Sequence, residues 1–185
     1  MQKRVVILAV LMVLFSSLAV AQQKEDKSKR PSPPAQASCK FPDGKAITVD
    51  YSSPRMKGRK IYGTQQESAL VPYGEVWRSG ANEATTFVTD VDLTVEGKEI
   101  PAGSYTIFTV PNANQWSLII NKKTGEWGIP YKWQSDELAR VPMNVSKTPG
   151  PVEDFTIAFD QMGGACTMNL DWADTRASVK FDEKK

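Results

Sequence analysis

The sequence contains no histidine among its 185 residues. Histidine supplies the general base of Ser-His-Asp and Cys-His nucleophile systems, and it is a common ligand of zinc and copper. Its absence therefore excludes those catalytic systems and the usual histidine-bearing metal sites. The chain also has almost no helical periodicity and no Cys-x-x-Cys redox pair. We expect no metal centre and no cofactor.

The N-terminal residues predict export from the cell. Lys3 and Arg4 precede an apolar run over residues 5–15, and residues 19–21 offer the small-x-small pattern of a signal-peptidase site, with cleavage after Ala21. The run is shorter than the roughly 20 apolar residues that span a bilayer. We therefore expect residues 1–21 to be a cleaved signal peptide, with no stable membrane insertion afterwards. Gln22 follows the cut, so we expect no lipid anchor and a periplasmic or secreted protein.

Removal of residues 1–21 lowers Lys+Arg from 23 to 21 and leaves Asp+Glu at 21. This neutral balance argues against a nucleic-acid binder, which presents a basic face to phosphates. Residues 22–36 are charged and proline-rich without a large apolar side chain, which predicts a disordered tether. The following residues, 37–182, have the size of one domain with a single core, and 183–185 form a charged tail.

The two cysteines, Cys39 and Cys166, lie near opposite ends of this domain. In an oxidising compartment an even number of cysteines usually indicates a bridge, so we predict a disulfide between them. The alternative is a pair of separate buried thiols. The loop that the bridge closes is long, and the chain-entropy model gives it about 4–5 kcal/mol of stabilisation.

Short runs of alternating apolar and polar residues cover most of the domain and predict strands. Glu96-Gly97 suits a two-residue hairpin, and residues 104–110, apolar on both faces, predict a central strand. In the last third, four short strands are expected, at 141–145, 155–159, 166–172 and 177–181, with turns at 163–164 and 173–175. About nine to ten such strands indicate an all-β fold, a single antiparallel β-sandwich (jelly-roll or immunoglobulin-like) or a flattened barrel.

Four stretches carry a resemblance to a known family. They are residues 51–62 (YSSPRMKGRKIY), 71–85 (VPYGEVWRSGANEAT), 100–108 (IPAGSYTIF) and 172–178 (WADTRAS). In this order they resemble the secreted bacterial family called domain of unknown function 2911, across essentially the whole mature domain. The resemblance implies an exported bacterial protein and points to no particular activity. The chain departs from the family pattern at residues 64–69, which affects one local loop.

The second of these stretches holds the main candidate ligand-binding residues. Arg78 offers a planar fork of donors, Asn82 both donates and accepts, Glu83 accepts, and Trp77 or Tyr73 supplies a flat apolar face. Such a set suits a sugar, whose hydroxyls need polar partners and whose C–H face stacks on an aromatic ring. The alternative is structural: Arg78 pairs with Glu83 across a hairpin, Asn82 ties the turn, and Trp77 belongs to the core.

A catalytic alternative uses the carboxylates of the same stretch. Glu75 and Glu83 are the candidates for the acid and the base or nucleophile of a glycoside hydrolase or lyase, with Arg78 as electrostatic stabiliser. Sequence spacing alone does not place the two carboxylates on either side of a bond. Single carboxylates also commonly face solvent without a catalytic role.

Other stretches allow weaker hypotheses. Trp127, with Tyr131 and Trp133, forms either a second aromatic ligand platform or a cover for one end of the sandwich. Basic residues at 55–60 form an anion site or an ordinary surface loop. Asp90 and Asp92 share a strand face but lack a calcium-loop pattern.

These observations lead to three functional hypotheses. We favour a non-catalytic binding or structural module for an envelope glycan or peptide. The second is the histidine-free hydrolase or lyase that uses Glu83 with Arg78. The third is an assembly partner recognised through an exposed sheet edge. The sequence leaves the oligomeric state open.

Overall fold

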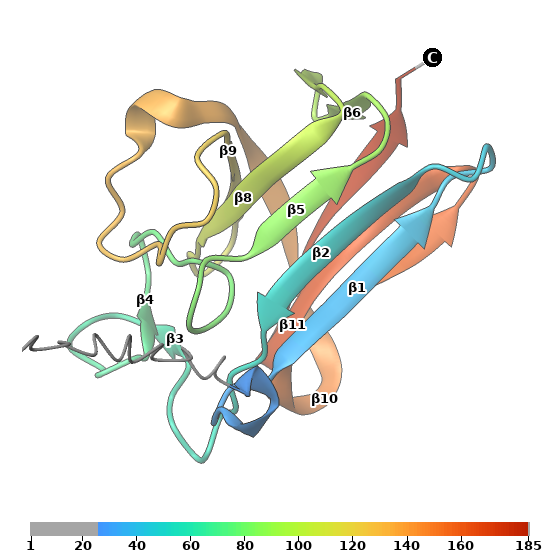
Figure 1. Ribbon diagram of the computed structural model, residues 1–185. Coiled ribbons are helices and arrows are strands. Elements are labelled where there is room, and N and C mark those ends of the chain that lie inside the picture. Colours follow the sequence, from blue (N-terminus) through green and yellow to red (C-terminus); the bar gives the residue numbers. More distant parts are fainter. Residues whose placement is uncertain (1–25, 185) are drawn as a thin grey trace, which may run out of the picture.

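The computed structural model describes residues 26–184 and shows an all-β protein (Figure 1). The predicted signal peptide therefore lies outside the described residues. Two short 3-10 turns are present, η1 (Lys27–Lys29) and η2 (Gln134–Asp136). The strands are β1 (Pro34–Lys40), β2 (Ala46–Ser52), β3 (Tyr62–Gly63), β4 (Val71–Pro72), β5 (Thr86–Thr89), β6 (Leu93–Val95), β7 (Lys98–Ile100), β8 (Gly103–Val110), β9 (Trp116–Asn121), β10 (Glu137–Met162) and β11 (Ala165–Glu183).

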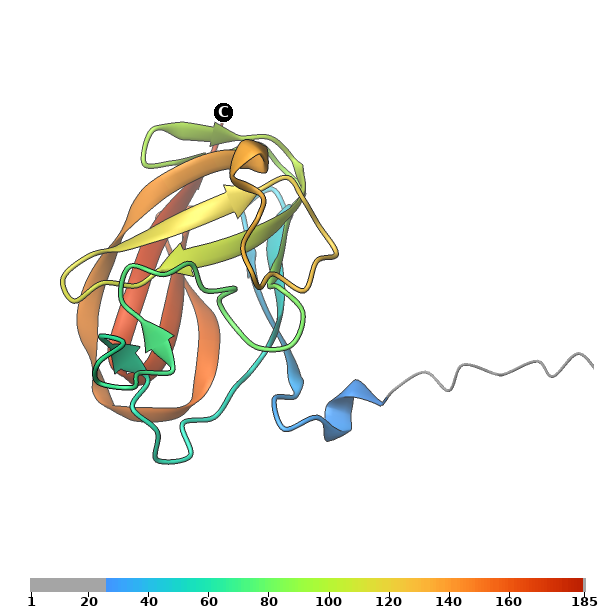
Figure 2. The same cartoon turned by 90° about the vertical axis from the view of Figure 1, so that its left-hand side faces the viewer.

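Nine of these strands form one sheet in the order β1-β2-β5-β8-β9-β10-β11-β6-β7, in which neighbouring strands are antiparallel. The sheet folds over into two layers because β10 first pairs with β9 and then with β11. Figure 2 shows β10 as the long orange ribbon that curves around one side of the molecule. The sheet does not close on itself. The predicted antiparallel β-sandwich class is confirmed.

Alternation along the strands fills the space between the layers with apolar side chains. β8 shows why it was predicted to be central: Tyr105 and Ile107 face the main core, whereas Phe108 and Val110 face the outside of the layer. There they join Ile119 of β9 in a second, smaller apolar cluster. The hairpin at Glu96-Gly97 joins β6 to β7, and both residues have the positive φ of a tight two-residue turn.

The last third of the chain differs from prediction. Instead of four short strands it forms the two long strands β10 and β11, which pair from Asn144↔Ser178 to Met162↔Ala165. The expected turn at 173–175 is absent. Its residues are absorbed in a β-bulge, where Ala173 takes a φ of 56° opposite Val152 and the register shifts on both sides. The turn at 163–164 is present as the tip of this long hairpin.

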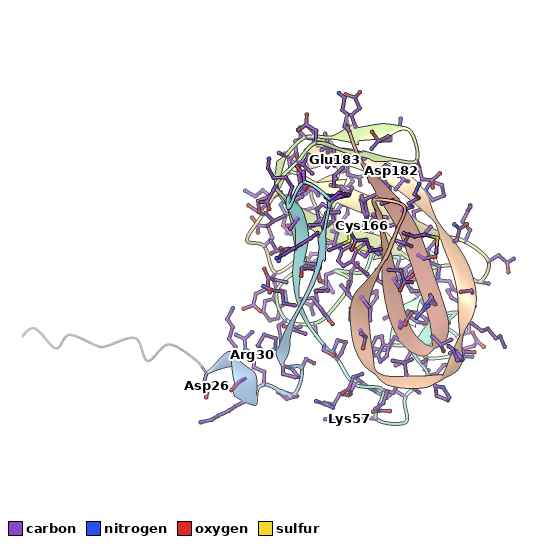
Figure 3. All side chains as sticks on the ribbon, turned by 90° about the vertical axis from the view of Figure 1, so that its right-hand side faces the viewer. Asp26, Arg30, Lys57, Cys166, Asp182 and Glu183 are labelled. Carbon is purple, nitrogen blue, oxygen red and sulfur yellow. A yellow bond between two sulfur atoms is a disulfide. The ribbon has the colours of Figure 1, made fainter. Side chains whose placement is uncertain are left out.

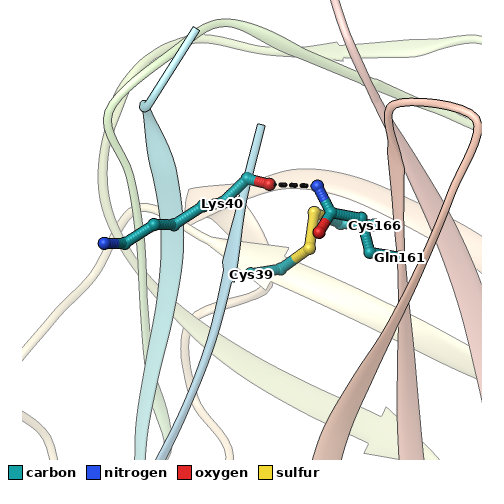
Figure 4. Close-up of a disulfide and its surroundings, with 4 residues drawn as sticks. All are labelled: Cys39, Lys40, Gln161 and Cys166. Atoms are coloured by element: carbon teal, nitrogen blue, oxygen red, sulfur yellow. Dashed lines mark hydrogen bonds between the residues drawn. A yellow bond between two sulfur atoms is a disulfide. The ribbon is translucent and has the colours of Figure 1, made fainter. Parts of the chain in front are cut away.

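The disulfide between Cys39 and Cys166 is present and joins β1 to β11 (Figure 4). The Cα atoms of the two cysteines are 6.1 Å apart, and both residues are buried. Beside the bridge, the side-chain amide of Gln161 donates a hydrogen bond to the carbonyl oxygen of Lys40. The far end of β1 is thus attached to the opposite layer, with which it forms no strand pairing.

The prediction of a disordered tether over 22–36 does not hold for residues 26–36. Pro34 already belongs to β1, where it pairs with Ser52, and residues 26–33 form what we call the N-terminal strap. The prediction rested on the lack of apolar side chains, but the strap is ordered by polar contacts. Residues 22–25 lie outside the described residues. At the C-terminus, the charged tail predicted for residues 183–185 starts too early. Glu183 still belongs to β11, where it pairs with Leu93 of β6.

Within residues 26–184 the structure contains no helix with the length and hydrophobicity needed to cross a bilayer.

Candidate functional site

Trp77 is part of the core. Its backbone forms an antiparallel bridge with Thr109 of β8, and its indole N–H donates to the carbonyl oxygen of Gly80 at 3.1 Å. The residue is 8% exposed, and its ring stacks on Trp172 with a centroid distance of 5.8 Å. Phe155 contacts the same ring edge-on at 4.9 Å. These contacts match the structural alternative for Trp77 and leave no open ring face for a sugar.

Arg78 lies at the surface, on the side chain of Trp127. Its guanidinium carbon is 4.9 Å from the centroid of the Trp127 ring, and Nη1 donates to the carbonyl oxygens of Trp127, at 3.0 Å, and of Asn82. Partial burial lowers the pKa of Arg78, and the nearby charge of Glu83 opposes that shift. Stacking and two backbone acceptors together fix the guanidinium in place.

Asn82 and Glu83 hold the N-terminal strap. The amide of Asn82 donates to the carbonyl oxygen of Ser32 at 2.9 Å. Glu83 accepts from Nη1 of Arg30 through both carboxylate oxygens, at 2.8 and 3.1 Å, and from Nζ of Lys27 at 2.9 Å. The hydrogen bond from Lys27 is the largest of the effects that lower the pKa of Glu83 to about 2. The ion pairs of Glu83 are thus with the strap, and Arg78 forms none with it.

The two candidate catalytic carboxylates contact different segments. Glu75 is exposed and accepts a hydrogen bond from the side-chain amide of Gln65, in the loop that joins β3 to β4. Glu83 contacts the strap, as described above. Tyr73 is partly buried against the main core and lines a cleft that neither carboxylate reaches.

A cleft of about 300 Å³ opens beside Arg78, and we call it the Arg78 cleft. Most of its wall is apolar, two arginines contribute the charge, and no carboxylate lines it. The lining residues are Ser32, Pro54, Arg59, Leu70, Val71, Trp77, Arg78, Gly80, Ala81, Ile129 and Trp172. It therefore combines an apolar surface with positive charge.

Exposed apolar side chains gather at this cleft. Within the described residues, four large hydrophobic side chains are exposed, and two of them, Leu70 (43%) and Ile129 (49%), line the cleft. A third, Trp127 (54%), lies under the guanidinium of Arg78, while Met162 lies at the tip of the β10–β11 hairpin. Apolar groups that cluster around a polar anchor mark ligand sites more often than single exposed side chains do.

A second cleft of about 420 Å³, the Tyr73 cleft, has a more polar lining. Arg59 lines both clefts, and its Nε and Nη2 donate to the carbonyl oxygens of Met56 and Arg55. Within this cleft the charge of Lys60 is paired with Glu67. The other lining residues are Met56, Ile61, Tyr62, Gly63, Tyr73, Ala173, Asp174 and Thr175.

The end of the molecule that carries the strap contains several basic side chains, and most of those described have acidic partners. Figure 3 shows Arg30 and Lys57 at this end, whereas Asp182 and Glu183 lie at the other. The predicted surface loop at 55–60 belongs here, and Arg55 in it is bound to both carboxylate oxygens of Asp154. Arg78 and Arg59 instead donate to carbonyl oxygens, Arg59 through Nε and Nη2 and Arg78 through Nη1.

Three of the four stretches that carry the family resemblance contribute to these two clefts. Residues 51–62 supply Arg59, residues 71–85 supply Arg78, and residues 172–178 supply Trp172. A sequence model of a family described as "Protein of unknown function (DUF2911)" matches residues 32–181. The chain belongs to this family. The matched range begins in the strap and ends in β11, so it includes both clefts. Comparisons with curated proteins and with solved structures found no match.

The remaining candidates have structural partners. Tyr131 and Trp133 pack on Phe108 over the outer face of β8, so they cover a face of the layer and not one end of the sandwich, while Trp127 stays exposed. Asp90 accepts from the backbone N–H of Ala46, and Asp92 from that of Ala102. No group of three or more Asp, Glu, Cys or His side chains suited to a metal ion occurs in the part of the chain that the structure describes.

Sequence reasoning missed Leu70, Ile129 and Ser32 as lining residues. Leu70 and Ile129 are large apolar residues in segments without strand alternation, and this was the available signal. Ser32 lies in the stretch predicted to be disordered, which offered no signal of this kind.

Proposed function

We propose that this protein is a non-catalytic binding module of the cell envelope whose ligand site is the Arg78 cleft. One observation carries the proposal: exposed Leu70 and Ile129 face a cleft that also contains two guanidinium groups and no carboxylate. Covering a half-exposed Leu or Ile side chain contributes about 1 kcal/mol at the usual area coefficient. A ligand bound there therefore gains binding free energy both from the burial of apolar surface and from its attraction to the guanidinium groups.

Of the two ligand classes expected from the sequence, the cleft fits a peptide better than a glycan. A sugar needs an open aromatic face on which to stack. Both aromatic residues that line the cleft, Trp77 and Trp172, are packed in the core, and the exposed Trp127 is not part of its lining. A peptide needs an apolar recess and a polar anchor, and the cleft has both.

The catalytic alternative has weaker support. Glu83, with a pKa of about 2, is ionised at neutral pH and therefore has no proton to donate as a general acid. Both of its oxygens are also bound by Arg30. For the sheet-edge hypothesis, β1 and β7 are the terminal strands, and the disulfide and Gln161 hold the end of β1 against the opposite layer.

A thermal-unfolding screen of the oxidised protein against muropeptides, short peptides and oligosaccharides tests the proposal. A ligand at about 100 times its Kd adds about 2.7 kcal/mol to the free energy of unfolding, which raises Tm by roughly 5–10 °C in a domain of this size. We expect a peptide to give such a shift in the wild type and no turnover of that peptide.

Matched variants locate the binding. Leu70→Ser with Ile129→Ser removes the apolar wall, and we expect it to abolish the shift. Met162→Ser removes an exposed apolar side chain outside the cleft and should leave the shift unchanged. Turnover of the ligand, an equal shift in both variants, or no shift with any compound of the screen contradicts the proposal.

A further inference from the structure

The guanidinium of Arg78 is only half satisfied. Nη1 donates to two carbonyl oxygens, whereas Nε has no acceptor and is buried. Within residues 26–184 it is the sole buried side-chain nitrogen or oxygen without a hydrogen-bond partner. Such a donor is costly to leave unpaired, and the cost is larger for a charged group. An acceptor supplied by a ligand removes this cost when a local shift of the Arg78 side chain brings Nε within its reach.

The unsatisfied side of the group has a specific shape. Nε–H and one N–H of Nη2 point in parallel, and this edge of the guanidinium matches the two oxygens of a carboxylate. The described residues make no hydrogen bond to Nη2. Of the two acidic residues nearest in sequence, Glu75 accepts from Gln65 and Glu83 is bound to Arg30 and Lys27. The protein therefore has a carboxylate-binding fork and no carboxylate of its own in it.

We propose that the Arg78 cleft binds the C-terminus of a peptide that ends in an apolar residue. The terminal carboxylate pairs with Nη2 of Arg78 and, after a local shift of that side chain that uncovers it, with Nε, and the last apolar side chain lies against Leu70 and Ile129. In a C-terminal residue both groups are attached to one Cα, and in the cleft their partners line one small space. This inference rests on the proposed function and specifies its ligand.

The size of the cleft favours a single terminal residue over a longer apolar chain. A volume of about 300 Å³ is at the lower end of ligand sites. Leu70 and Ile129 remain about half exposed, so the cleft is shallow, and a long alkyl chain would stay largely in water. The positive charge of Arg59 in the same lining adds to the attraction for an anion.

Calorimetric titration with two acetylated dipeptides tests this inference. Acetyl-Ala-Leu carries a free C-terminal carboxylate, and acetyl-Ala-Leu-amide differs only in lacking it. We expect the acid to bind the oxidised protein about 10-fold or more tightly than the amide, because a hydrogen bond to a charged group is lost in the amide. Acetyl-Ala-Ser, which keeps the carboxylate and lacks the apolar side chain, should also bind more weakly.

Variants test whether the difference in affinity between the acid and the amide depends on the guanidinium of Arg78. In Arg78→Gln the acid should bind no better than the amide, and Arg78→Lys, which keeps the charge but loses the fork, should retain part of the preference. Arg140→Gln removes an exposed arginine that pairs with Glu137 outside the cleft and should leave both affinities unchanged. If Arg78→Gln does not fold, the wild type still gives an answer: the preference should disappear as pH falls below about 3.5, where an α-carboxyl becomes protonated.

The possible failures are distinguishable. Equal binding of acid and amide, lost in Leu70→Ser, overturns the inference and leaves the proposed function standing. Binding of decanoate or of phosphatidylglycerol vesicles, with no binding of the acid peptide, overturns it in favour of a lipid. If neither dipeptide nor any compound of the unfolding screen binds, the inference and the proposed function both fail.

Discussion

The two ends of β1 are attached to the rest of the protein by different means. At the C-terminal end, Cys39 forms a covalent bridge to β11, and both sulfur atoms belong to buried residues. At the N-terminal end, the strap is held by hydrogen bonds and ion pairs to Asn82 and Glu83, and the Glu83 side chain is 41% exposed. The first attachment is independent of salt and pH, whereas the second depends on both. The Arg78 cleft adjoins the second, through Ser32.

The largest expected effect comes from removal of the disulfide at the C-terminal end of β1. Replacement of both cysteines (Cys39→Ser with Cys166→Ser) should lower the free energy of unfolding by about 2–5 kcal/mol, because the unfolded chain regains the freedom that a long closed loop removes. Urea unfolding of the variant, compared with the oxidised and the reduced wild type, measures this. A loss below about 1 kcal/mol would mean that noncovalent packing alone holds this end of β1.

An intermediate effect is expected at Gly128, in the loop that packs against Arg78. Gly128 has a φ of +88°, and a Cβ placed there lies 2.8 Å from the Cβ of Ala84 and 3.1 Å from that of Arg78. Gly128→Ala should therefore lower the free energy of unfolding by about 1–3 kcal/mol, through backbone strain and overpacking.

Gly125→Ala is the matched control for this loop. Gly125 also has a positive φ, of +76°, but a Cβ there meets no atom within 4 Å. Gly125→Ala should therefore introduce backbone strain without a steric clash. Urea unfolding should show a smaller loss of unfolding free energy for Gly125→Ala than for Gly128→Ala. Equal losses would show that packing against Arg78 and Ala84 contributes nothing.

The smallest expected effect concerns the ion pairs that hold the strap at the N-terminal end of β1. Glu83 has a pKa of about 2 in the folded protein against an ordinary value of 4.5, so its contribution is complete above pH 4.5 and is lost as pH falls towards 2. Because the side chain is 41% exposed, screening limits this contribution to about 1 kcal/mol or less.

Glu83→Gln should accordingly lower the free energy of unfolding slightly at pH 7 and make it less sensitive to pH between 4.5 and 2. Parallel urea titrations of the wild type at both pH values provide the reference. Glu75→Gln is the control, since Glu75 forms no ion pair within the described residues. An unchanged pH profile in Glu83→Gln would show that the ion pairs of the strap do not stabilise the fold.

Local patterns in the sequence predicted the fold class well, and long-range pairing limited the rest. Alternation identified β8 as a central strand, because apolar residues on both of its faces require cover on both sides. The same alternation did not reveal that β10 and β11 are continuous, because residues 173–175 have the composition of a turn yet lie in a bulge. A bulge depends on the partner strand, which the local sequence does not contain.

For the candidate site, the sequence pointed to residues 71–85, which contribute to the lining of the Arg78 cleft, and missed the partners of its polar residues. Arg78, Asn82 and Glu83 all make specific contacts, but their partners lie at 27–32 and at Trp127, far away in the chain. The strap was predicted to be disordered because hydrophobic burial was the criterion, and its order comes from charge and hydrogen bonds instead. Trp77 was offered both as a platform and as core, and its stacking on Trp172 decides for the core.

The course of β10 through both layers has a consequence for cooperativity. Residues near Val141 hydrogen-bond with β9, and residues near Ile157 with β11, yet both belong to one uninterrupted strand. Separation of the layers would strip one part of this strand of its partners and expose the core side chains that the two layers share. Because β10 joins the two layers without a break, we expect the sandwich to unfold as a single cooperative unit.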